Sequence, residues 1–191
     1  MDSWKIGEIR VTRILEMSDP LRTPAEWFPD STDEAIRPHL HWLIPKSLSP
    51  VTGQIIMPIQ SYLVQTRRHT ILVDGCVGNN KMCAYFPHWN DRNDNTFLAQ
   101  LALAGVAPEQ VDFVLCTHVH VDHCGWNTRL VNGRWVPTFP NARSSWPAAN
   151  WKLPKQGAMT RETGSTITMC CRFSRLAGSL LSIWIMPSMM K

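Results

Sequence analysis

Residues 117–125, which read Thr-His-Val-His-Val-Asp-His-Cys-Gly, concentrate side chains that can bind metal ions. His118, His120, Asp122 and His123 fall within six consecutive positions of a chain that has only seven histidines. Imidazole and carboxylate suit zinc, and iron, manganese or cobalt also accept them. This composition predicts a metal site. The alternative is a set of histidines with ordinary surface or core roles.

The spacing within this motif indicates how the ligands would be shared. Residues i and i+2 of an extended segment point the same way, so His118 and His120 can reach one cation together. Asp122 and His123 are adjacent and would diverge in an extended chain. If the chain turns into a helix there, both can face a second cation, and an aspartate in a first helical turn also suits the helix dipole. Gly125 would permit close backbone packing beneath the metals.

Other residues with chemical potential are less distinctive. His39 and His41 repeat the i, i+2 spacing, but they lack a carboxylate partner and lie among prolines, so a structural role is the alternative to a metal or pocket contact. Four aromatic residues could line an apolar substrate pocket or simply pack their loops: Trp27, Phe28, Trp42 and Trp89. No residue stands out as substrate-binding. Cys116 is expected in the core, and the place of Cys124 is open.

The segments around the motif combine strands and helices. We expect a strand or strand pair over 4–16, an irregular stretch over 18–58, strands over 59–65 and 70–73, a helix over 96–104, a helical turn over 108–111, a strand over 112–116, and a hairpin over 128–136. Asn132-Gly133 at the centre of the last hairpin is typical of a type I′ turn. This order predicts an α/β layered fold with the motif directly after a buried strand.

The motif resembles the His-x-His-x-Asp-His signature of the metallo-β-lactamase superfamily. The resemblance covers residues 4–143 and includes the strand pair ending in Leu-Val-Asp-Gly at 72–75. The stretch 118–140, with Gly-Trp-Asn at 125–127, is most similar to the lactonase-type metallo-hydrolases. It implies the N-terminal half of an αβ/βα sandwich. It also implies that His118 and His120 serve a first zinc ion, and that Asp122 and His123 serve a second.

By this resemblance the activity is dinuclear zinc hydrolysis of a lactone or similar ester. Paired ions lower the pKa of a bridging water, and the resulting hydroxide attacks the polarised carbonyl. Asp122 would hold the second metal and orient the water or shuttle its proton. Asp74 resembles a family aspartate that lies behind the metals and hydrogen-bonds a ligand or the motif loop. The alternative for Asp74 is a simple Asp-Gly turn.

The last part of the chain departs from the family pattern. That pattern requires two further histidines and a bridging aspartate, but no histidine follows His123 and no aspartate follows Asp122. Residues 1–143 hold 13 basic and 14 acidic residues, whereas residues 144–191 hold six basic residues and one acidic residue. We therefore divide the chain into the N-terminal part of a domain, 1–143, and an atypical tail, 144–191, which we expect to be non-native or disordered.

A slip of the reading frame accounts for this tail. If each new codon starts with the last base of the old one, Trp146-Pro147 forces alanine, Trp151-Lys152 forces glutamate and Met169-Cys170 forces valine. With permissible codons, the shifted frame encodes an amino-acid sequence rich in helix formers. The sequence as given has Pro147 and Pro154 in the same place, and prolines oppose a helix. A genuinely divergent tail is the alternative. With the missing ligands, we expect the 191-residue chain to have weak activity or none.

Composition limits the class of protein and the kinds of partner that this chain can have. Hydrophobic residues make up 44% and charged residues 18%, which fits a globular protein and excludes wholesale disorder. No export signal or apolar stretch long enough for a membrane span is evident, so we expect a cytoplasmic protein with reduced cysteines and no membrane partner. The basic tail would suit nucleic acid, but an accident of frame removes that hypothesis. A small-molecule substrate remains the expected partner, and the alternative function is a non-catalytic metal-binding or interaction module.

Overall fold

The computed structural model describes residues 1–83, 86–118 and 120–145. They contain eight strands, five α-helices and four 3-10 turns. The strands are β1 (Ser3–Ile6), β2 (Ile9–Arg22), β3 (Ile55–Gln65), β4 (Thr70–Val73), β5 (Phe113–Leu115), β6 (Thr128–Val131), β7 (Arg134–Pro137) and β8 (Arg143–Ser145). The helices are α1 (Pro24–Trp27), α2 (Asp33–Ile36), α3 (Leu40–Leu43), α4 (Thr96–Leu103) and α5 (Val121–Cys124). The 3-10 turns are η1 (Arg37–His39), η2 (Pro87–Trp89), η3 (Pro108–Gln110) and η4 (Gly125–Asn127).

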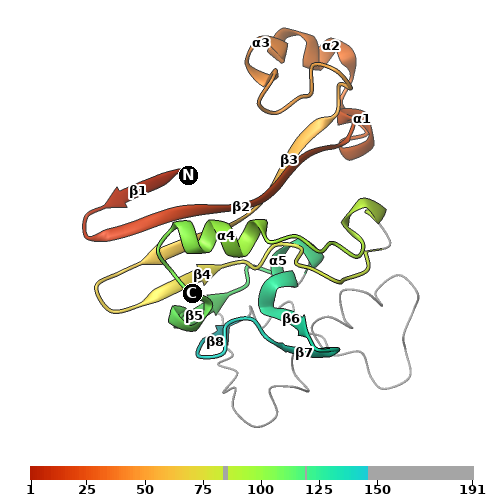
Figure 1. Cartoon of the computed structure of the whole chain (residues 1–191). Coiled ribbons are helices and arrows are strands. Elements are labelled where there is room, and N and C mark those ends of the chain that lie inside the picture. Colours follow the sequence, from red (N-terminus) through yellow and green to blue (C-terminus); the bar gives the residue numbers. More distant parts are fainter. Residues whose placement is uncertain (84–85, 119, 146–191) are drawn as a thin grey trace, which may run out of the picture. The chain divides into compact units, whose positions relative to one another are not determined.

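The chain forms two compact units. The first combines Met1–Glu16 with the chain from Gln60 onward, and the second is Met17–Ile59. Strands β2 and β3 each begin in one unit and end in the other. Figure 1 shows the first unit as a sheet with α4 alongside it, and the second as a set of short helices. The predicted α/β class is confirmed.

A six-stranded sheet in the order β1-β2-β3-β4-β5-β8 organises the first unit. The pairs β1–β2 and β3–β4 are antiparallel, whereas β4–β5 and β5–β8 are parallel. In the parallel part Val73 pairs with Leu115, so β4 and β5 end side by side. The residues that follow them, Asp74 and Cys116, therefore leave the sheet at the same edge.

The core of this unit lies between α4 and the sheet. Phe97 and Leu101, four residues apart on α4, are fully buried because positions i and i+4 share one helix face. Leu63, Leu72 and Val114 of the central strands are buried as well. The apolar positions of the helix thus fill the core as expected, whereas in the first strand pair Ile6 and Ile9 are exposed and the polar residues Thr12 and Glu16 point inward with Ile14.

The prediction for residues 18–58 was partly wrong. β2 continues to Arg22, β3 already begins at Ile55, and single-turn helices occupy much of the interval. Local capping explains the helices: the backbone N–H of Thr23 donates to the Glu26 carboxylate at 2.7 Å, and the Thr32 hydroxyl accepts from the N–H of Ala35 at 3.2 Å. A helix of four residues is too short to show a hydrophobic period.

The remaining elements agree with the sequence patterns. The strand pair, the helix, the helical turn and the hairpin over 128–136 occur where they were expected, and the strands expected over 59–65 and 70–73 lie within β3 and β4. Asn132 and Gly133 have φ values of 49° and 73°, as a type I′ turn requires. Strand β8 pairs in parallel with β5 and extends to Ser145, and the rest of the predicted tail lies outside the described residues. Within the described part of the chain, no helix is both long and apolar enough to cross a membrane.

Among the glycines of the described residues, Gly125, directly after α5, is the one whose added Cβ atom would lie closest to neighbouring backbone. A Cβ atom at this position would lie 1.7 Å from the carbonyl oxygen of Val77 and 2.7 Å from that of Cys76. Because both neighbours are backbone atoms, a side chain at 125 could be accommodated only if one of the two loops moved. The expected close packing at Gly125 is therefore present, and the neighbouring backbone belongs to the loop after β4.

We expect Gly125→Ala to lower the free energy of unfolding by at least about 3 kcal/mol, because the added methyl group would overlap the closely packed backbone of Val77. Gly133→Ala is the control: no atom lies within 4 Å of its added Cβ, and only the positive φ opposes the change, at a cost of about 1–2 kcal/mol. Urea unfolding of the two variants measures the difference. Equal losses would show that the loops can separate freely.

Candidate functional site

The histidine motif lies at the carboxyl edge of β5. Thr117 and His118 follow the strand, His120 precedes α5 in extended conformation with φ −72° and ψ 159°, and α5 itself is a single turn. Asp122 and His123 therefore lie in a helical turn after an extended approach. This is the change of backbone conformation that the spacing of the motif predicted.

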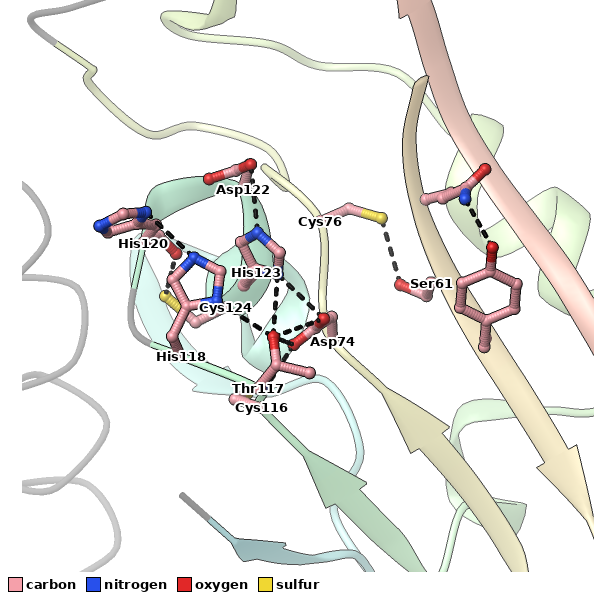
Figure 2. A network of polar contacts seen from close by, with 12 residues as sticks. Ser61, Asp74, Cys76, Cys116, Thr117, His118, His120, Asp122, His123 and Cys124 are labelled. Carbon is pink, nitrogen blue, oxygen red and sulfur yellow. Dashed lines mark hydrogen bonds and ion pairs between the residues drawn. The ribbon is translucent and has the colours of Figure 1, made fainter. Parts of the chain in front are cut away.

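The side chains of the motif form one continuous polar network, which Figure 2 shows. His118 Nε2 lies 3.0 Å from His120 Nδ1, and His118 Nδ1 lies 3.1 Å from the Thr117 hydroxyl. The rings of His118 and His123 approach to 3.8 Å between centroids. His123 Nε2 lies 3.3 Å from an Asp122 carboxylate oxygen. The structure thus brings all four predicted ligands together.

Asp74 supports this network from the neighbouring strand end. It is largely buried and has a positive φ of 63°. Its carboxylate accepts hydrogen bonds from the backbone N–H of Thr117 at 2.7 Å and from the Thr117 hydroxyl at 2.9 Å. It also lies 2.9 Å from His123 Nδ1. Asp74 therefore forms the turn after β4 and contacts the motif at the same time, so the two interpretations of this residue are compatible.

The two carboxylates determine the protonation of His123. Burial alone would lower the pKa of His123, but the hydrogen bonds and charges of Asp122 and Asp74 outweigh it and raise this pKa to about 9. Burial would conversely raise the pKa of each carboxyl group, and hydrogen bonds, led in both cases by that from His123, lower it instead. In the metal-free chain at neutral pH, His123 is therefore an imidazolium between two carboxylates.

His118 has the opposite character. Burial lowers its pKa, and the neighbouring His123 and His120 lower it further against the pull of the carboxylates, so His118 is neutral at pH 7. The Thr117 hydroxyl donates its proton to the ionised Asp74, which leaves its oxygen to accept from Nδ1–H of His118. We assign this tautomer from the network. It leaves the lone pair of Nε2 on the side of His120.

The donor set fits transition-metal binding. The neutral imidazole of His118 lies beside that of His120, with its Nε2 lone pair hydrogen-bonded to His120 Nδ1, and an ionised carboxylate lies beside the imidazole of His123. Outer hydrogen bonds from Thr117 and Asp74 fix two of the rings, as is usual for metal-ligating histidines. Among the described residues, however, no three histidine, cysteine or acidic side chains are arranged to hold a metal ion. The network as it stands is held by hydrogen bonds between the would-be ligands.

Two residues that the sequence did not single out support the site. Thr117 links Asp74 to His118, as described above. Glu16, at the end of the first-unit part of β2, accepts hydrogen bonds from Trp126 Nε1 at 2.6 Å and from the N–H of Val77 at 2.9 Å. The sequence did contain a signal for Glu16: buried positions on β2 alternate, and a carboxylate falls on the inward side in register with Ile14.

The weaker candidates lie elsewhere. His39 and His41 are exposed residues of the second unit, with Trp42 Nε1 donating to His39 and His41 Nδ1 3.0 Å from the Pro38 carbonyl. Of the four aromatics, only Trp89 is buried in the first unit, where it packs on Phe86. Trp27, Phe28 and Trp42 belong to the second unit.

The two cysteines that flank the motif are both buried. Cys116 accepts a hydrogen bond from the Asn127 amide at 3.2 Å, and the Cys124 thiol donates to the carbonyl of His120 at 3.2 Å. Cys116 thus has the core position expected of it, and Cys124 helps to hold the turn at His120.

The raised pKa of His123 makes the stability of the metal-free chain depend on pH. A histidine with a raised folded-state pKa stabilises fully below its unfolded pKa, about 6.5, and loses this effect as the pH rises through about 9. We expect the free energy of unfolding to fall by about 2–3 kcal/mol across this window. Urea titrations at several pH values would show the fall, and His123→Gln should remove it. His69→Gln, at an exposed histidine, is the control and should retain it.

The comparisons with known proteins agree with this fold. Residues 56–149 match the family model of the metallo-beta-lactamase superfamily. The hydrolase AbOPH of the beta-lactamase superfamily superposes with a TM-score of 0.61 at 22% identity, over 92% of this chain and 54% of that one. A probable metal-dependent hydrolase from Staphylococcus aureus superposes with a TM-score of 0.59 at 22% identity, over 78% and 50% of the two chains.

A third structure is AidC, a dizinc quorum-quenching lactonase in complex with a product. It superposes with a TM-score of 0.67 at 16% identity, over 99% of this chain and 62% of that one. The chain thus spans between a half and two thirds of the length of these three structures. No curated protein matches the sequence significantly. The family match and the shared fold together identify residues 56–149 as a domain of the metallo-beta-lactamase superfamily.

Proposed function

We propose that this chain carries the first metal-binding segment of a zinc-dependent hydrolase that acts on a lactone or a similar ester. One observation carries the proposal: His118, His120, Asp122 and His123 meet in a single network at the carboxyl edge of the parallel strands. A chance group of histidines would not be backed by an ionised aspartate from the neighbouring strand end, as this network is by Asp74.

Each residue has a distinct part in this proposal. His118 and His120 would hold one zinc ion, and Asp122 with His123 would hold the second. Bound zinc supplies Lewis acidity and a hydroxide nucleophile at neutral pH. Thr117 orients His118 through Nδ1, so the nitrogen that would bind the ion is Nε2, which is hydrogen-bonded to His120 Nδ1 in the metal-free chain. Asp122 is ionised and can accept a proton from a water molecule beside it.

The similar structures support the choice of metal and substrate. AidC is described as a dizinc lactonase, and its structure contains a homoserine product. The other two are a hydrolase and a probable metal-dependent hydrolase. Because the reacting bond is chosen by loops outside the metal ligands, the lactone is proposed from these neighbours and not from the geometry of the motif.

A non-catalytic metal-binding or interaction module is the second candidate. The observation that favours it is the sequence itself: no histidine follows His123 and no aspartate follows Asp122. The family pattern completes its two metal sites with such residues. We further propose that residues 144–191 form an atypical tail to the domain of residues 1–143, which would explain why the ligands are missing here.

Metal binding tests the ligand assignment directly. We expect titration calorimetry to detect binding of Zn²⁺ or Co²⁺ to the chain, and the paired change His118→Ala and His120→Ala to weaken it at least tenfold. The matched control is His39→Ala with His41→Ala, which removes two exposed histidines of identical spacing in the second unit. Equal loss in the two double variants, or no loss in either, would overturn the assignment.

Hydrolysis tests the reaction. We expect the zinc-loaded chain to open N-acyl homoserine lactones only weakly, because few metal ligands are present, and a chelator to abolish that turnover. Asp122→Asn should lower it at least tenfold, whereas Asp91→Asn, outside the network, should not. Turnover that survives the chelator would contradict a metal-dependent reaction. Zinc binding without turnover of any lactone or ester would favour the non-catalytic module.

A further inference from the structure

Glu16 is a buried acidic residue that the proposed chemistry does not use. Only 3% of its surface is exposed. Burial raises the pKa of its carboxyl group, and hydrogen bonds from Val77, Trp126 and Gly78 together with the charge of Arg92 partly offset this rise. Burying a carboxylate costs folding energy unless its oxygens are satisfied. Glu16 meets this requirement with three hydrogen-bond donors.

The hydrogen bonds of Glu16 join two separate loops. One carboxylate oxygen accepts from the N–H of Val77 at 2.9 Å, and the other accepts from the N–H of Gly78 at 3.1 Å and from Trp126 Nε1 at 2.6 Å. Val77 and Gly78 belong to the loop after β4, which begins with Asp74. Trp126 belongs to the turn that follows His123. Three donors from two loops thus converge on one side chain.

The same two loops are also paired through their backbones. The N–H of Gly75 donates to the His123 carbonyl at 2.6 Å, the N–H of Trp126 donates to the Gly75 carbonyl at 2.6 Å, and the N–H of Gly125 donates to the Cys76 carbonyl at 2.7 Å. Only a glycine at 125 allows this approach. Any shift between the loops would therefore move His123 relative to Asp74, which lies 2.9 Å from its ring.

Packing against α4 holds Trp126, one of the three donors to Glu16, in place. The indole of Trp126 stacks on Phe97 of α4 with 5.1 Å between ring centroids and 12° between ring planes. Its N–H is consequently directed to Glu16, and its ring is fixed to the helix. The carboxylate of Glu16 thereby connects β2, the β4 loop and the turn after α5.

We propose that Glu16 is a positioning residue for the metal motif, and that it sets the register between the Asp74 loop and the His123 turn. The proposal extends the function above, since the ligand role of His123 belongs to that function. Glu16 does not contact the ligands. It acts by accepting from both loops at once, and a carboxylate, unlike an amide, has two acceptor oxygens and so satisfies all three donors.

Glu16→Gln tests the hydrogen-bonding role of this residue without changing the size of its side chain. The amide has the shape of the carboxylate, but its NH2 group must face at least one of the three donors. We expect amide hydrogen exchange in the metal-free chain to become at least tenfold faster at Gly75, Gly125 and Trp126. These amides bond only to the partner loop and do not contact Glu16, so their exchange reports the register. Val111→Ala, a buried change at the amino-terminal side of β5, is the control for general destabilisation.

The Co²⁺-loaded chain provides the second measurement. We expect Glu16→Gln to weaken Co²⁺ binding about tenfold and to alter the visible absorption of the bound ion, whereas Val111→Ala should leave both unchanged. Unchanged loop exchange in Glu16→Gln, or an equal rise in Val111→Ala, would overturn the positioning role. If exchange rises as expected but the wild-type chain does not bind Co²⁺, the positioning of the loops stands and the proposed metal function fails.

Discussion

The site depends on the contact between two loops that leave the sheet at the same edge. Parallel pairing of β4 with β5 places Asp74 beside the beginning of the motif. From there the loops run together, and three backbone hydrogen bonds of 2.6–2.7 Å connect them. Such proximity of two backbones is possible only without a side chain at the point of contact, and Gly125 supplies that condition. The orientation of His123 follows from this contact.

Charge determines what this arrangement can bind. Two ionised carboxylates, Asp74 and Asp122, flank the ring of His123 and keep it protonated in the metal-free chain. A carboxylate beside a histidine nitrogen attracts a proton and a divalent cation for the same electrostatic reason. Metal binding at His123 would therefore require the loss of this proton, and such coupling is general for histidine ligands. His118, in contrast, is already neutral and needs no such exchange.

The sequence predicted the regular elements well because each carries its own pattern. The alternation of apolar residues in the first strand pair, the i, i+4 pair Phe97 and Leu101, and the Asn132-Gly133 turn are local signals. The single-turn helices of the second unit were missed because their stability comes from caps such as Thr23 with Glu26, and not from a repeating apolar face. The histidine motif was found from residue type and spacing alone, and its role in metal binding stays a prediction.

The sequence by itself determined which residues meet in the candidate site and the α/β class of the fold, and it predicts their division into two pairs. The spacing of His118 and His120 in an extended chain, and of Asp122 and His123 in a helical turn, is a local property. It can therefore be recognised in the sequence without knowledge of the fold. The tertiary structure decided which distant residues complete the site. Asp74 is 49 residues from His123, and Glu16 is 110 residues from Trp126. Their contacts exist because the strands pair in one particular order, and no local pattern contains that order.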